Sequence, residues 1–151
     1  MPDRRLSDAD FRSLAEFRYQ LRRFLAFSEG QARAAGLNPQ QHQLLLAVRA
    51  AAPDAPTIGA LAGRLILRHH SVVGLLDRLE QRRLVRRVRH PPDRREARIQ
   101  ITADGASLLH GLAVAHWAEL RRARPQLMDA LQKVSGARPR ARTRRRRTGA
   151  T

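Results

Sequence analysis

Residues 57–87 read TIGALAGRLILRHHSVVGLLDRLEQRRLVRR and contain two apolar repeats joined by a brief link. The first repeat follows Thr57, a favourable residue type for a helix N-cap. Its apolar side chains recur three and four residues apart, at Ile58, Leu61, Ala62 and Leu65. The second repeat keeps this helical spacing through about Gln81, at Val72, Leu75, Leu76 and Leu79. Two short helices joined by a few residues are typical of a helix-turn-helix.

A pair of short strands is expected directly after these helices. LVRRV (residues 84–88) and ARIQIT (residues 97–102) have the alternation of apolar and polar residues that indicates strands. Pro91 and Pro92 lie between them and cannot donate hydrogen bonds to a sheet, so they belong to a turn. The sequence therefore predicts a β-hairpin with a charged tip, whose two legs pack on the helices.

Two amphipathic helices are predicted before the helix-turn-helix. The first covers residues 8–31, with Ser7 as its N-cap and Gly30 with Gly36 marking its end. It holds all four phenylalanines of the chain, which is more apolar surface than a small domain usually covers, and this hints at a subunit interface. The second helix starts at Pro39 and runs to about residue 52.

A long helix is predicted after the hairpin. Thr102 is its expected N-cap, and it runs to about residue 124, where Pro125 is expected to break it. A final short helix is expected from Gln126 to about Val134. Residues 135–151 have no apolar periodicity and are predicted to be a disordered, arginine-rich tail.

Composition narrows the class of protein. The 151 residues suit one domain, and the net charge of +17 favours a polyanionic partner. Seven arginines and no acidic residue lie in residues 137–151, yet the rest of the chain stays strongly basic. The absence of cysteine excludes disulfides and thiolate chemistry. We found no stretch of about 18 apolar residues, no apolar signal core and no catalytic motif, so we expect a cytoplasmic protein that is neither membrane-bound nor an enzyme.

The combined motifs resemble the MarR (multiple antibiotic resistance regulator) family. Its pattern joins T-I-x-x-L-A-x-x-L, a recognition helix ending D-R-L-E-x-x-G-L-V-x-R, and a wing D-x-R-x-x-x-x-x-L-T-x-x-G. The corresponding stretches are residues 57–87 and DRREARIQITADG, residues 93–105. The wing's acid and arginine fall on Asp93 and Arg95, and the arginine after L-V falls on Arg87.

The resemblance covers roughly residues 8–134 and implies a mainly α fold. It would comprise a winged helix-turn-helix DNA-binding lobe over residues 39–101, with a two-stranded β wing, and dimerisation helices at 8–31 and 103–134. The chain departs from the family pattern where Arg83 replaces a glycine that ends the recognition helix, His90 an acid and Ile101 a leucine.

The outward face of the second short helix carries the candidate base contacts. With its apolar residues facing the core, the outward residues are Arg68, His69, His70, Ser71, Val73, Gly74 and Arg78. Arginine can contact a guanine edge or a phosphate, histidine and serine can donate to either, and valine can meet a thymine methyl. The glycine would let the backbone approach DNA closely. A solvated helix face is the alternative, but the helix-turn-helix context favours DNA contact.

The charged hairpin tip is a candidate probe of the minor groove. Arg94, Arg95 and Arg98 are either a soluble loop or cations that gain from the negative potential of a narrow groove. The resemblance implies that Arg95 inserts there and that Asp93 helps to orient it.

Histidines elsewhere have less specific interpretations. Adjacent helical residues such as His69 and His70 point about 100° apart, so no metal site, and no cofactor, is expected there. By the resemblance, His42, His110, His116 and Trp117 lie on helices that line or approach an effector cleft between the dimer region and the DNA-binding lobes. Ordinary packing of these residues is the favoured interpretation.

The sequence thus predicts a regulator of transcription that binds double-stranded DNA. The resemblance implies a homodimer on a pseudo-palindromic operator, with recognition helices about 34–36 Å apart, acting as a repressor that a small phenolic or lipophilic effector releases. One alternative is a sequence-tolerant architectural nucleic-acid-binding protein that depends on its basic surface and tail. Another is a winged-helix protein that binds a protein partner.

Overall fold

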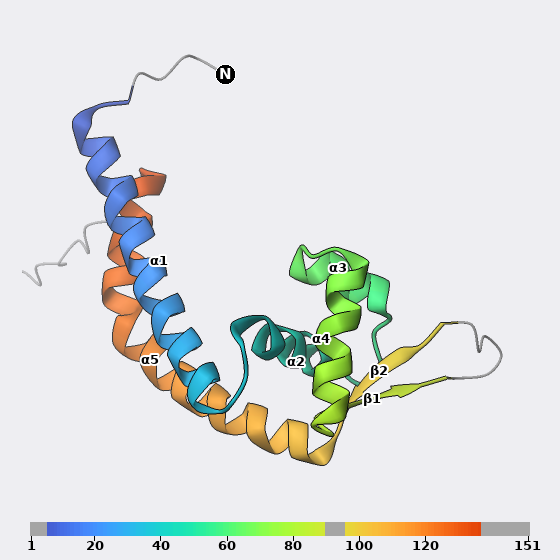
Figure 1. Ribbon diagram of the computed structural model, residues 1–151. Coiled ribbons are helices and arrows are strands. Elements are labelled where there is room, and N and C mark those ends of the chain that lie inside the picture. The colour runs from blue at the N-terminus through green and yellow to red at the C-terminus, as the bar shows by residue number, and fades with distance from the viewer. Residues whose placement is uncertain (1–5, 90–95, 137–151) are drawn as a thin grey trace, which may run out of the picture. The chain divides into compact units, whose positions relative to one another are not determined.

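The computed structural model describes residues 6–89 and 96–136 of the chain (Figure 1). Its elements are α1 (Asp8–Ala34), α2 (Pro39–Ala50), α3 (Ile58–Leu65), α4 (His69–Gln81), β1 (Val85–Val88), β2 (Arg98–Ile101) and α5 (Ala103–Ser135). The chain divides into two compact units, one of residues 24–121 and one of the described residues 6–23 and 122–136. The order of helices and the single two-stranded sheet confirm the predicted winged helix-turn-helix.

The core of the larger unit lies between α2, α3, α4 and the hairpin. Each of these helices turns its apolar stripe inward, as the spacing of apolar residues predicts. The largest fully buried side chains are those of Leu37, Leu44, Leu45, Leu61, Val72, Leu76, Leu79, Val85 and Ile99. Because β1 and β2 each supply a core residue, the hairpin is fixed to the helices at its base.

The hairpin pairs antiparallel, with Val85 opposite Ile101 and Val88 opposite Arg98. On its polar face, the guanidinium of Arg86 donates two hydrogen bonds to Oε1 of Gln100, at 3.1 and 2.9 Å. The segment before α3 extends this sheet, since the Ile99 amide donates to the Pro56 carbonyl at 2.9 Å. The wing is therefore joined by backbone hydrogen bonds to the start of the helix-turn-helix.

Side chains cap the starts of three helices. Ser7 and Asp10 cap α1 reciprocally, and the Thr57 hydroxyl accepts from the Ala60 amide at 3.1 Å, so both predicted caps are confirmed. At α2 the cap is Asn38, which forms a capping box with Gln41 before the predicted Pro39. The sequence signal for Asn38 was present, because asparagine three residues before glutamine is a capping pattern.

The predicted break at Pro125 was wrong, and two approximate helix ends differ from the structure by a few residues. Helix α1 continues through Gly30 to Ala34 and ends before Gly36, whose φ of +73° terminates it. Helix α2 ends at Ala50 rather than near residue 52. Helix α5 is one helix through Ser135, with Pro125 inside it. Proline removes one amide donor and crowds the carbonyl four residues earlier, but the helix continues on both sides of Pro125.

Arg83 adopts the left-handed conformation, with φ of 58°. The turn has the hydrogen bonds of a helix ending on a left-handed residue: Arg83 N to Glu80 O and Leu84 N to Leu79 O, both 2.9 Å. Arginine thus occupies the conformation for which glycine is preferred, and its exposed side chain does not offset the steric cost.

We expect Arg83→Gly to stabilise the fold by about 0.5–1 kcal/mol. A left-handed non-glycine residue costs about 1–2 kcal/mol, and the larger conformational entropy of glycine in the unfolded chain cancels part of the gain from removing that cost. Thermal denaturation followed by circular dichroism measures the change. Arg83→Ala is the matched control, since it removes the same side chain and keeps a Cβ in the left-handed region. Equal melting temperatures for the two variants would contradict the explanation.

Candidate nucleic-acid interface

The N-terminal half of α4 presents polar and basic side chains to solvent. Arg68, His69, His70 and Arg78 are exposed, while Ser71, Val73 and Gly74 are half-buried. Arg68 occupies the N-cap position, where its side chain forms no capping hydrogen bond. A Cβ added at Gly74 would meet nothing within 4 Å, so internal packing does not require glycine there. The predicted contact residues of α4 are thus exposed or half-buried, opposite its buried apolar residues.

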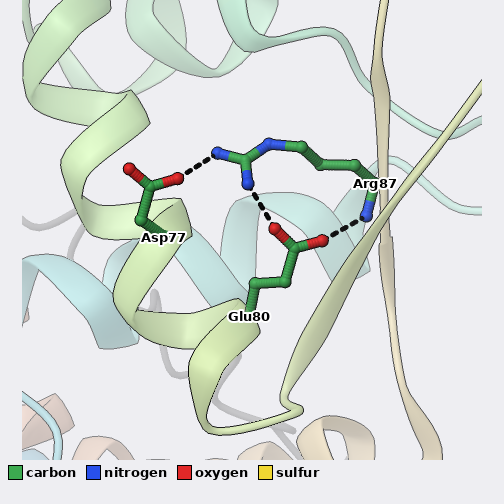
Figure 2. A network of polar contacts seen from close by, with 3 residues as sticks. All are labelled: Asp77, Glu80 and Arg87. Atoms are coloured by element: carbon green, nitrogen blue, oxygen red, sulfur yellow. Dashed lines mark hydrogen bonds and ion pairs between the residues drawn. The ribbon is translucent and has the colours of Figure 1, made fainter.

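A three-residue ionic network joins α4 to the wing (Figure 2). The Arg87 guanidinium on β1 donates to Oδ1 of Asp77 at 2.6 Å and to Oε2 of Glu80, and its backbone amide donates to Oε1 of Glu80 at 3.1 Å. Burial acts to lower the pKa of Arg87, but hydrogen bonds and charge from both acids outweigh it and raise the pKa. This arrangement orients the wing and offsets part of the negative charge of two carboxylates that would otherwise repel phosphates.

The start of α5 is locked to the entry of the wing. The Thr102 hydroxyl donates to the Arg83 carbonyl at 2.7 Å and accepts from the Gly105 amide at 3.0 Å, which confirms its predicted capping role. The Thr102 amide donates to the Leu84 carbonyl at 3.1 Å. These contacts fix the returning strand of the wing against the end of α4.

The wing residues predicted to probe a groove are described only in part. Asp93, Arg94 and Arg95 lie outside the described residues. Arg98 belongs to β2 rather than to the tip, and its guanidinium donates to the Ala55 carbonyl at 3.0 Å. A contact of Arg98 with DNA stays a prediction. In the structure, the hydrogen bond of Arg98 to Ala55 holds β2 to the segment before α3.

His42 and His116 are buried together in the larger unit. Their rings stack with centroids 4.9 Å apart and planes at 24°. His116 Nδ1 hydrogen-bonds the Leu112 carbonyl, which only accepts, so Nδ1 carries the proton. His116 Nε2 then accepts from the Ser28 hydroxyl at 2.7 Å when the ring is neutral. These contacts link α1, α2 and α5 and favour the packing interpretation of both histidines.

Two phenylalanines contact the buried histidine pair, whereas the tryptophan next to His116 in sequence is exposed. Phe24 and Phe27 meet the His116 ring edge-on, with centroids 6.1 and 5.9 Å away. Trp117, also named from the sequence for an effector cleft, is 68% exposed, and His110 is exposed as well. Trp117 therefore does not share the buried surroundings of the two histidines, although it follows one of them in sequence.

We expect the fold to lose stability as the pH falls from about 7.5 to 5.5. Burial, and secondarily the charge of His116, lower the pKa of His42 below its model-peptide value of 6.5. The neutral ring is then favoured in the folded chain, so this stability is complete above about pH 6.5 and is lost as the pH falls toward the lowered pKa. Urea denaturation at a series of pH values measures the loss.

The control for this pH dependence is His42→Phe, which keeps a flat ring beside His116 but cannot take up a proton. Its stability should change less between pH 7.5 and 5.5 than that of the wild type. Parallel pH profiles would show that His42 is not the source of the dependence.

Known proteins resemble the helix-turn-helix and its wing in sequence and fold. A sequence model described as "MarR family" matches residues 35–96, which include α2, α3, α4 and the first strand of the wing. This part of the chain is similar to the MarR family.

Individual proteins are also similar to this chain. The HTH-type transcriptional regulator YsmB of Bacillus subtilis (strain 168) is 34% identical over 65 residues, which are 43% of this chain and 44% of YsmB. The chain thus matches less than half the length of that curated relative.

Two solved structures share the fold. Staphylococcus aureus MepR, as an F27L mutant bound to an oligodeoxyribonucleotide, is 20% identical with a TM-score of 0.65, over 80% of this chain and 93% of MepR. CouR of Rhodococcus jostii RHA1, bound to p-coumaroyl-CoA, is 25% identical with a TM-score of 0.60, over 77% and 86%.

The structure assigns a role to Arg87, a residue for which the sequence predicted none. Arg87 matches the family's arginine after L-V, but this match alone predicts no contact for its side chain. Its two partners lie three residues apart, at Asp77 and Glu80, and so share one face of α4. That spacing was the available signal for an ionic link to the wing.

Among residues 6–89 and 96–136, no group of three or more His, Asp or Glu side chains could hold a metal ion. Within the same described part of the chain, no helix has the length and apolar character needed to cross a bilayer.

Proposed function

We propose that this chain is a transcriptional regulator of the MarR type that binds double-stranded DNA sequence-specifically as a homodimer on a pseudo-palindromic operator. The observation that carries the proposal is the exposed basic face at the start of α4, held in register with the wing by Arg87. In this arrangement the N-terminal residues of α4 reach base edges, and Arg68 and Arg78 supply cations for guanine or phosphate. MepR, with the same fold, was solved bound to DNA, which supports the proposal.

The proposed dimer uses the smaller unit. Its α1 and α5 segments leave large apolar side chains exposed, at Phe11, Leu14, Tyr19, Leu21, Met128, Leu131 and Val134. This many large exposed apolar side chains in one small unit favour an association site over a solvated face. A second copy of the chain covers it, because a two-fold dimer presents two recognition helices to two half-sites.

Regulation by a small effector is part of the same proposal. CouR was solved with a bound acyl-coenzyme A, and that observation concerns CouR. For this chain, an effector that binds the DNA-free arrangement more tightly than the DNA-bound one would release the operator and relieve repression. Trp117, exposed on α5, is the candidate contact among the residues named from the sequence.

The test starts with selection of a duplex from a random 30-bp pool by the purified chain. Binding to this duplex and to an unselected duplex of equal composition is then measured over a salt series. We expect tighter binding to the selected duplex at every salt concentration, by a factor on the order of 10³ or more. Equal affinity for both duplexes would overturn the proposal.

Arg68→Gln should weaken binding to the selected duplex by roughly tenfold or more, because a charge-assisted contact of about 1–3 kcal/mol is lost. The matched control is Arg33→Gln, which removes the same charge from the last turn of α1. Equal losses for the two variants would show that only total charge matters.

The second candidate function, sequence-tolerant nucleic-acid coating, is favoured by one observation: the seven arginines within residues 137–151. Deleting these residues should weaken binding to the unselected duplex and reduce its salt dependence, while preference for the selected duplex persists. Loss of that preference on deletion would favour the coating function.

A further inference from the structure

Ile66 occupies the turn between α3 and α4 in a conformation that isoleucine rarely adopts. It is the C-cap of α3, with φ of 55° and ψ of 44°, and it is 93% exposed. A β-branched residue in the left-handed region is strained, and glycine or asparagine is the usual occupant. No burial within the described chain compensates for the strain at this side chain.

The residues on either side of Ile66 differ from it. Leu65 and Leu67 are half-buried and pack against the core, so only the middle residue of this apolar triplet turns outward. The turn is also basic: residues 64–70, RLILRHH, contain two arginines, two histidines and no acid. Arg64, Arg68, His69 and His70 are all exposed. An isolated apolar side chain therefore projects from a cationic edge next to the start of the recognition helix.

We propose that Ile66 packs against a deoxyribose of the DNA backbone beside the groove that α4 enters. This rests on the proposed function and adds a positioning contact to it. Sugars are the apolar part of the backbone, and the flanking arginines suit the phosphates on either side of a sugar. Ile66 lies outside α4, and such peripheral contacts position a protein on the duplex without reading its sequence. The left-handed backbone fixes the direction of its Cβ before DNA arrives.

The experiment compares Ile66→Asn with Ile66→Leu on the selected and unselected 30-bp duplexes, over a salt series. Asparagine tolerates the left-handed region but removes the apolar surface, whereas leucine keeps that surface. We expect Ile66→Asn to weaken binding to both duplexes by roughly fivefold, the equivalent of one partly buried aliphatic side chain. Ile66→Leu should bind within about twofold of the wild type. The salt slope of both variants should match the wild type, because no cation is lost.

Three results would overturn this inference while leaving the proposed function intact. They are wild-type affinity of Ile66→Asn, a loss confined to the selected duplex, and equal losses for the two variants. The second would indicate a base contact, and the third a requirement for isoleucine's shape or backbone. Arg68→Gln is the positive control, because it should reduce the salt slope by about one. Failure of the wild type to bind either duplex would instead overturn the proposed function, and the Ile66 contact with it.

Discussion

We expect the Gly105→Ala variant to lose about 2–3 kcal/mol of unfolding free energy, the cost of forcing an extra carbon into a packed site. A Cβ at this position would lie 2.1 Å from the Leu84 carbonyl oxygen and 2.9 Å from Cγ1 of Ile101. The oxygen belongs to the backbone that leads into β1 and accepts the Thr102 amide, so it cannot move aside as a flexible side chain would. Urea denaturation measures the loss.

Gly111→Ala is the matched control for this prediction, because Gly111 lies in the same helix and a Cβ there would meet nothing within 4 Å. This control should gain about 0.5–1 kcal/mol from helix propensity. The two substitutions are chemically identical and are expected to have opposite signs. If Gly105→Ala were as stable as Gly111→Ala, the close packing of α5 on the wing would be refuted.

The wing junction shows how far local sequence patterns could predict the site. Apolar periodicity located α3 and α4, and alternation located β1 and β2, because those patterns record which side chains face the core. The cap at Thr102 followed from residue type and position. The left-handed conformation of Arg83 could be expected only from the family pattern, which has a glycine there, because the turn into β1 imposes it against the preference of arginine.

Contacts between elements were harder to foresee than the elements themselves. The Arg87 network needs β1 to pass beside the last turns of α4, and that follows from the paired wing rather than from any single segment. Similarly, His42 and His116 are far apart in sequence, and only the packing of α2 on α5 brings their rings together. Pro125 shows the opposite error, in which a strong local signal was outweighed by the long helix around it.

The second large effect concerns the proposed dimer. We expect Phe11→Glu to raise the dimer dissociation constant by roughly a thousandfold. Phe11 is 57% exposed on α1, and burying a phenylalanine against a partner contributes about 2 kcal/mol. A two-fold interface contains the substitution twice, so the losses from both copies add to about 4 kcal/mol. Sedimentation equilibrium over a range of protein concentrations measures the dissociation constant.

Operator binding should fail together with dimerisation, because one recognition helix and one wing contact only half of a pseudo-palindromic site. Arg12→Gln is the matched control: it changes the neighbouring exposed residue without removing apolar surface, and it should leave the dimer intact. A dimer that survives Phe11→Glu would show that this face of α1 is not the interface. A monomeric Phe11→Glu chain that keeps full operator affinity would show that DNA binding does not depend on the two-fold pair.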